Sequence, residues 1–205
     1  MTHNPIPKER SGKPMDSPGG GGPHRYVGTI PVKLLGGKLY YISFTNNKTP
    51  YTRVYLLAHK SDALHAYLSF EGWMKMQHGY RIKWLHSNCG REYLSSKFNA
   101  HLATHRIEHR LTMHDMLQEN GIAEQLNHTL LEKVHSMLHG AQLLKSLWGE
   151  ALAHTTRLKN WTLTKSLEQA TLLQELTGMK LDLSEIHKWG RRVIVYDSTN
   201  SKLSG

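Results

Sequence analysis

The spacing of the apolar residues changes once along the chain, and that change restricts the folds open to it. Three early runs of β-branched, aromatic and leucine residues, divided by short turns, predict strands at residues 27–35, 38–45 and 52–58. After residue 61 the apolar positions recur every three or four residues, as they do in amphipathic helices. This order predicts an α/β domain whose mixed sheet combines an antiparallel three-stranded meander with parallel strands and is flanked by helices.

The later elements follow from the same pattern. We predict helices at residues 61–78, 95–105, 121–140 and 146–161, and short strands at residues 81–86, 108–112 and 192–196. The third helix has the clearest pattern, because one stripe collects its apolar residues: Ile122, Leu126, Leu130, Val134, Met137 and Leu138. Asn120 stands directly before that predicted helix and is expected to be its N-cap.

The charge of the chain favours polyanionic partners. Lys and Arg number 26 against 16 Asp and Glu, a formal charge of +10, and residues 1–60 hold nine of these cations but two of the acids. DNA or RNA is therefore an expected partner, although a solvated basic surface would give the same composition.

The single cysteine, Cys89, excludes internal disulfides and a four-cysteine zinc site. No apolar run reaches the roughly 20 residues of a membrane span, so we expect a protein of the nucleus or cytoplasm, neither secreted nor membrane-bound.

Two segments carry a recognisable order of polar residues. The first is Ser-Asn-Cys-Gly-Arg-Glu-Tyr at residues 87–93. The second is Leu-Gln-Glu-Asn-Gly-Ile-Ala-Glu-Gln-Leu-Asn-His-Thr-Leu-Leu-Glu at residues 117–132, with 35 residues between Asn88 and Glu124. Shorter matches lie at residues 36–41, 51–59, 147–151 and 176–180. In order and spacing these segments resemble the integrase catalytic domain of copia-type LTR retrotransposons, within the retroviral integrase superfamily, and the resemblance extends over residues 28–201.

The resemblance implies a ribonuclease-H-like fold and DNA strand transfer with Mg²⁺ or Mn²⁺ held by three carboxylates. The family glutamate corresponds to Glu124, which is the expected catalytic residue and metal ligand. The second family acid corresponds to Asn88, and the alignment of residues 28–41 places Arg25 at the first. Residues 1–24 are expected to be a disordered, basic and glycine-rich arm, residues 25–160 the catalytic-core-like domain, and residues 161–205 a truncated C-terminal extension.

The two replaced acids predict a chain without integrase activity. Two Mg²⁺ ions about 3.5–4 Å apart need several carboxylate oxygens, whereas the Asn88 amide is neutral and the Arg25 guanidinium repels cations. Asp16 lies nine residues before Arg25, within the arm, and is not expected to substitute for the lost acid. Several departures from the family pattern, like Asp to Asn at position 88, can arise from one C-to-T or G-to-A change, so we interpret the chain as a degenerate copy.

Nucleic-acid contacts are expected around the family glutamate, at Gln118, Asn120, Gln125 and His128, with Lys83 as the basic contact. The family forms oligomers, and the sequence does not specify the oligomeric state of this chain. An alternative function is that of a non-enzymatic DNA- or RNA-binding protein recruited by the host, which would use the basic N-terminal region.

Two further patterns are open to a functional interpretation. Four histidines at spacings of four, four and five residues could form a zinc site: His101, His105, His109 and His114. We do not favour zinc, because the sequence supplies no obvious cysteine or acid to complete the ligand set. Five tryptophans could stack on bases, but their scattered positions favour packing in the core instead: Trp73, Trp84, Trp148, Trp161 and Trp189.

Overall fold

The computed structural model describes residues 24–29, 32–34, 36–47, 49–87, 95–111, 117–163, 170–178, 182, 184 and 186–192. For residues 24–29 and 117–123 it describes the backbone alone. Within these ranges five strands form one sheet in the order β3-β2-β1-β4-β5. The strands are β1 (His24–Thr29), β2 (Tyr40–Thr45), β3 (Thr52–Leu57), β4 (Trp84–Ser87) and β5 (Glu108–Leu111).

The sheet changes direction between β1 and β4. β1 pairs antiparallel with β2, and β2 pairs antiparallel with β3. β4 runs parallel to β1, and β5 runs parallel to β4. Parallel neighbours need a crossover connection, and α1 and α2 provide it here. The mixed α/β class predicted from the sequence is therefore confirmed.

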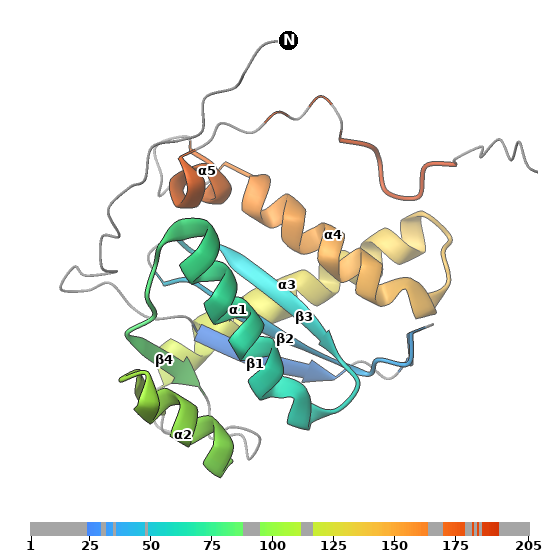
Figure 1. The fold of residues 1–205 in the computed structure, drawn as a ribbon. Coiled ribbons are helices and arrows are strands. Elements are labelled where there is room, and N and C mark those ends of the chain that lie inside the picture. Colours follow the sequence, from blue (N-terminus) through green and yellow to red (C-terminus); the bar gives the residue numbers. More distant parts are fainter. Residues whose placement is uncertain are drawn as a thin grey trace, which may run out of the picture.

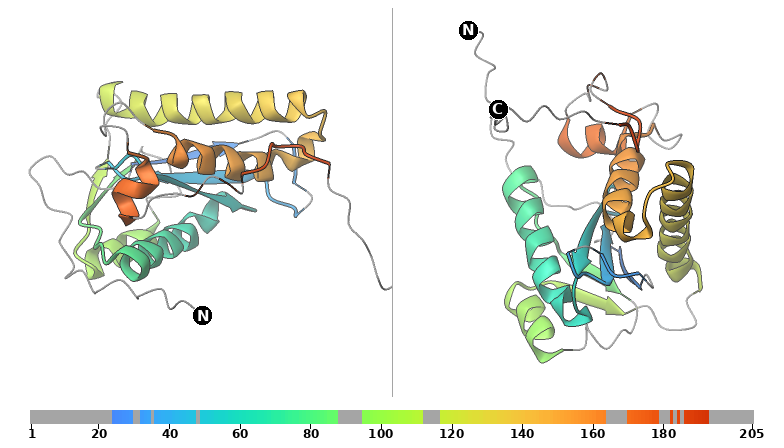
Figure 2. Two further views of the ribbon diagram at one scale, coloured as in Figure 1. Left: turned by 90° about the horizontal axis from the view of Figure 1, so that it is seen from above. Right: turned by 90° about the vertical axis from the view of Figure 1, so that its right-hand side faces the viewer.

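Helices cover both faces of the sheet. α1 and α2 lie against one face, and α3 and α4 pack side by side against the other, as Figure 1 and Figure 2 show. The helical elements are η1 (Lys60–Asp62), α1 (Ala63–His78), α2 (Ser96–Thr104), α3 (Leu117–Gly140), η3 (Lys145–Leu147), α4 (Trp148–Trp161) and α5 (Leu172–Thr177). No helix within the described ranges has the length and apolar character that crossing a membrane would require.

Successive side chains of β2 point to opposite faces of the sheet, and the core accordingly consists of two clusters, one on each face. Ile42 and Phe44 pack against α1 and α2, where the Phe44 ring stacks on Phe70 with centroids 4.9 Å apart. Tyr41 points to the opposite face and meets Trp148 of α4 edge to face. Because successive side chains of a strand point to opposite faces, one strand supplies both cores. The two cores hold the helices at fixed positions on the sheet.

The structure corrects two predicted boundaries. β1 spans residues 24–29, not 27–35; the sequence reason is Pro31, which cannot donate a backbone hydrogen bond to a partner strand. The third predicted helix begins at Leu117, so Asn120 lies inside α3 and is not its N-cap. Leucine, glutamine and glutamate at positions 117–119 all favour helix, which explains the earlier start.

At the C-terminal end, one helix was missed by the sequence prediction, and one predicted strand falls almost entirely outside the described residues. α5 was not predicted, although its Leu172 and Leu176 are buried and it packs against α4. The predicted strand at residues 192–196 lies outside the described residues except for Arg192, which is not in a strand.

Candidate functional site

Two of the expected site positions are carried by neighbouring parallel strands. His24 of β1 is paired with His86 of β4. Because the two strands run parallel, the next residue of β1, Arg25, is at the level of the next residue of β4, Ser87. Asn88 comes directly after β4 but lies outside the described residues. The topology therefore places the backbone of Arg25 beside the end of β4, where the chain continues into Asn88.

Glu124 lies near the N-terminal end of α3 and its side chain is exposed. It stands off the apolar stripe of the helix, whose members Leu130, Val134 and Leu138 are buried as predicted. One turn further on, Asn127 is 2% exposed, and its Oδ1 accepts a hydrogen bond of 3.1 Å from the buried Ser43 hydroxyl on β2. Asn127 therefore ties the helix segment that carries Glu124 to the centre of the sheet.

The expected nucleic-acid contacts do not all lie at one place. Gln118 and Asn120 are in the first turn of α3, where the structure describes the backbone alone. Gln125 and His128 are exposed, and His128 Nδ1 lies 3.5 Å from Glu132 Oε2. Lys83 directly precedes β4, so it lies at the opposite end of that strand from Ser87. Its backbone carbonyl accepts a hydrogen bond of 2.9 Å from Glu108 N–H.

Comparisons with known proteins agree with this architecture. No protein-family model matches the chain. Over 169 residues, 82% of its length, the chain is 30% identical to the retrovirus-related Pol polyprotein from transposon TNT 1-94 of Nicotiana tabacum. The chain is an integrase-like domain of LTR retrotransposons. The matched segment spans 13% of that polyprotein.

The fold of the integrase-like domain is also found in a solved structure. The HTLV-2 integrase catalytic core domain, in complex with magnesium and in a trimeric form, aligns with a TM-score of 0.55 and 13% sequence identity. The alignment covers 76% of this chain and 97% of that one. The likeness shows that this chain has a mixed α/β fold similar to the ribonuclease-H-like fold of an integrase catalytic core.

The HTLV-2 core is in complex with magnesium, and the residue types at the expected metal-ligand positions of this chain do not suit that ion. Of the three expected metal-ligand positions, Glu124 is the one with a carboxylate, since the others are Asn88 and Arg25. Among the described residues no group of three or more His, Cys, Asp or Glu side chains is arranged to hold a metal ion. A pair of hard dications needs several anionic oxygens, and these three positions offer one carboxylate between them.

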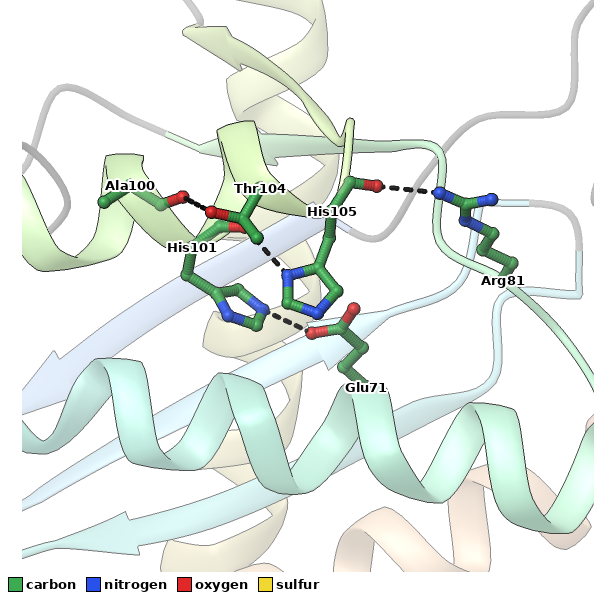
Figure 3. Close-up of polar contacts among 6 residues, drawn as sticks. All are labelled: Glu71, Arg81, Ala100, His101, Thr104 and His105. Carbon is green, nitrogen blue, oxygen red and sulfur yellow. Dashed lines mark hydrogen bonds and ion pairs between the residues drawn. The ribbon is translucent and has the colours of Figure 1, made fainter.

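Two of the four histidines, His101 and His105 of α2, belong to a polar cluster that also contains Glu71 of α1. His101 Nε2 of α2 lies 2.7 Å from Glu71 Oε2 of α1, and the rings of His101 and His105 are 4.1 Å apart (Figure 3). His105 Nδ1 donates to the His101 carbonyl at 3.0 Å, and Arg81 donates to the His105 carbonyl at 2.9 Å. The structure thus brings an acid to this cluster from α1, which sequence spacing could not show.

Among the described residues, no further His, Cys, Asp or Glu side chain joins this cluster in a group that could hold a metal ion. His109 lies on β5, where its Nε2 is 2.8 Å from the Ser87 hydroxyl, and His114 is outside the described residues. One ring nitrogen of His101 and one of His105 are already engaged in hydrogen bonds. In the described residues the cluster ties α1 to α2.

Three of the five tryptophans of the integrase-like domain, Trp73, Trp84 and Trp148, pack against other residues of the domain. Trp148 is 2% exposed, and its Nε1 donates to the Val32 carbonyl at 2.7 Å. Trp73 packs between Tyr51 and His78, and Trp84 lies against Arg110. These contacts support the core-packing interpretation for Trp73, Trp84 and Trp148.

Proposed function

We propose that this integrase-like domain binds nucleic acid but does not catalyse DNA strand transfer. The carrying observation is the position of Arg25 in β1, beside the end of β4 that leads into Asn88. In an active two-metal site these neighbouring strands would each present a carboxylate. Here they present a cation and a neutral amide, so the formal charge of the three positions is zero.

Electrostatics supports the loss of catalysis. In two-metal phosphoryl transfer, one ion activates the attacking oxygen and the other stabilises the leaving oxygen. Both ions depend on anionic ligands that offset their mutual repulsion. Glu124 alone, exposed on α3, would bind one ion weakly at most. The substitution pattern of the sequence supports the same proposal, that of a degenerate copia-type copy no longer maintained for transposition.

The basic charge of the chain supports nucleic-acid binding. The formal charge of +10 favours polyanions through counterion release. Gln125 and His128 are exposed beside Glu124 and could contact a phosphate backbone together with Gln118 and Asn120. We keep Lys83 as a weaker candidate, because it lies at the opposite end of β4 from the other positions.

The experiment is a strand-transfer assay with labelled DNA ends in Mg²⁺ or Mn²⁺, combined with calorimetric titration of each metal. The natural chain is expected to give no joined product and no binding heat. The double variant with Arg25→Asp and Asn88→Asp should bind metal. A triple variant that also carries Glu124→Gln should lose this binding. Product from the natural chain, in amounts comparable to an active integrase, would refute the proposal.

A further inference from the structure

The turn between β2 and β3 and the C-terminal half of α4 form a region without acidic residues. Residues 46–61 contain no Asp or Glu, and neither do residues 151–163. The structure brings these two segments together, since α4 packs against β3 and Asn160 hydrogen-bonds to Thr52. Neither segment itself supplies a carboxylate to the cations of this region.

Lys159 is the central cation of this region. Its Nζ donates to the Pro50 carbonyl at 2.6 Å and to the Thr52 hydroxyl at 2.9 Å, both neutral acceptors. Within the described part of the chain it makes no ion pair with a carboxylate. Burial, and then repulsion from Lys133 on the neighbouring helix α3, lowers the pKa of Lys159 to about 8. The fold thus holds an ammonium group whose charge is poorly compensated, and a bound anion would compensate it.

Arg157 lies two residues before Lys159 on α4. Its side chain is exposed, and its guanidinium lies 5.5 Å from the centre of the Trp161 ring. Burial raises the pKa of Tyr51 above its usual value, and the nearby charges of Arg53 and Arg157 oppose this rise. Arg157 is therefore close enough to act on Tyr51, the residue between the two acceptors of Lys159.

Aromatic rings lie among these cations. Tyr51 stacks on Trp73 with centroids 5.5 Å apart, and the Arg53 guanidinium lies 4.2 Å over the Trp73 ring. Arg53 Nη1 is buried and has no hydrogen-bond partner among the described residues. These rings pack against one another and against Arg53, so they fix the position of the turn and of Arg53 rather than offering free faces for stacking on bases.

We infer that the β2–β3 turn, the C-terminal half of α4 and Lys133 of α3 bind the phosphodiester backbone of a nucleic acid, with Lys133, Arg157 and Lys159 as the phosphate contacts. The inference rests on the proposed nucleic-acid function and adds a location to it. Three cations spread over two helices match a chain of phosphates better than a single small anion.

This surface differs from the one expected around the family glutamate. Glu124 and Lys133 are nine residues apart in α3, which is two and a half helical turns, so their side chains project from opposite sides of the helix. His128, four residues after Glu124, shares the Glu124 side of the helix. Substitutions can therefore separate the two surfaces.

The test measures binding of a fluorescently labelled DNA duplex and a labelled single strand to the full chain across a salt series. Lys133→Gln with Arg157→Gln should reduce the slope of log affinity against log salt by about 1–2 and weaken binding several-fold. The matched control is Lys75→Gln with Lys97→Gln, two exposed lysines on α1 and α2 on the opposite face of the sheet. The control pair should leave the slope close to that of the natural chain.

A second readout follows Lys159 without replacing it. Addition of DNA should raise the pKa of Lys159, measured by NMR of carbon-labelled lysine, because a nearby phosphate stabilises the ammonium form. The inference would be overturned if the natural chain binds DNA while the salt slope is unchanged in the Lys133 and Arg157 variant and the pKa of Lys159 does not change on binding. The proposed function would then still stand. A natural chain that binds neither duplex nor single strand would overturn both.

Discussion

Asn160 of α4 forms two hydrogen bonds with the backbone of Thr52 on the edge strand β3. Its Oδ1 accepts from the Thr52 N–H at 3.0 Å, and its Nδ2 donates to the Thr52 carbonyl at 2.7 Å. Both residues are buried. A side-chain amide thus takes the place of a neighbouring strand at the outermost position of the sheet.

Replacement of this amide should destabilise the domain strongly. Asn160→Ala leaves a buried N–H and a buried carbonyl without partners, which should lower the free energy of unfolding by roughly 2–4 kcal/mol. Urea denaturation measures the change. Asn99→Ala, at an exposed position of α2, is the control and should change the free energy by less than about 0.5 kcal/mol. Equal effects of the two variants would contradict the assigned role.

Asn127 should control the attachment of the Glu124 helix. Asn127→Ala removes the acceptor of the buried Ser43 hydroxyl and should cost about 1–3 kcal/mol. Hydrogen exchange should show faster exchange of α3 amides than of α1 amides, because α3 loses its polar link to β2. Gln125→Ala, two residues earlier and exposed, should alter neither stability nor exchange appreciably. Uniform acceleration over both helices would instead indicate general destabilisation.

Gly149 lies where a methyl group has no space. A Cβ at this position would stand 2.7 Å from Leu34 Cδ1 and 2.9 Å from Leu56 Cδ1. Gly149→Ala should therefore lower the free energy of unfolding by about 1–3 kcal/mol through overpacking, although alanine favours helix. A methyl group at Gly72 of α1 would meet no atom within 4 Å. Gly72→Ala should accordingly stabilise the domain by about 0.5–1 kcal/mol, and thermal melting of both variants gives the comparison.

Lys159 should make stability depend on pH in the alkaline range. Its pKa in the folded chain, about 8, is below the usual 10.5, so the unfolded chain binds this proton more tightly. The free energy of unfolding should therefore rise as the pH increases from about 8 towards 10.5, by an amount on the order of 1–3 kcal/mol. Below that range the cost of the buried charge is fully present.

Lys159→Met isolates this contribution. Tyr51 and Tyr55, whose pKa values are raised by burial, lower stability at the highest pH, but they do so equally in both proteins. The free energy of unfolding of the natural chain relative to that of the variant, measured by urea titration at several pH values, should increase as the pH rises above 8. Parallel pH curves for the two proteins would contradict the lowered pKa.

Apolar periodicity was sufficient to predict the α/β class and most helices. The stripe on α3 is buried at Leu130, Val134 and Leu138, and Glu124 is exposed beside it, as the spacing indicated. These features depend on residues three or four apart, which a sequence shows directly. The predicted start of α3 was wrong because an asparagine such as Asn120 suits an N-cap but is also tolerated inside a helix. The local sequence does not decide between these two positions.

The polar contacts that hold the site could not be predicted in the same way. Ser43 and Asn127 are 84 positions apart, and Thr52 and Asn160 are 108 apart. Glu71 reaches His101 from another helix, 30 positions away. Such pairs depend on the angle and offset at which helices cross the sheet. The cations around Lys159 were missed for the same reason, although the absence of acids from residues 46–61 and 151–163 was a visible signal.

The Asn160 amide also sets a lower limit on the length of a fragment that can fold. A fragment ending at residue 147 would include all five strands but lose α4, and with it the helix that packs against β3 and the amide that pairs with Thr52 at its edge. An open edge recruits strands from other molecules. Such a fragment should accumulate as insoluble aggregate, whereas one that extends through residue 163 keeps the edge closed.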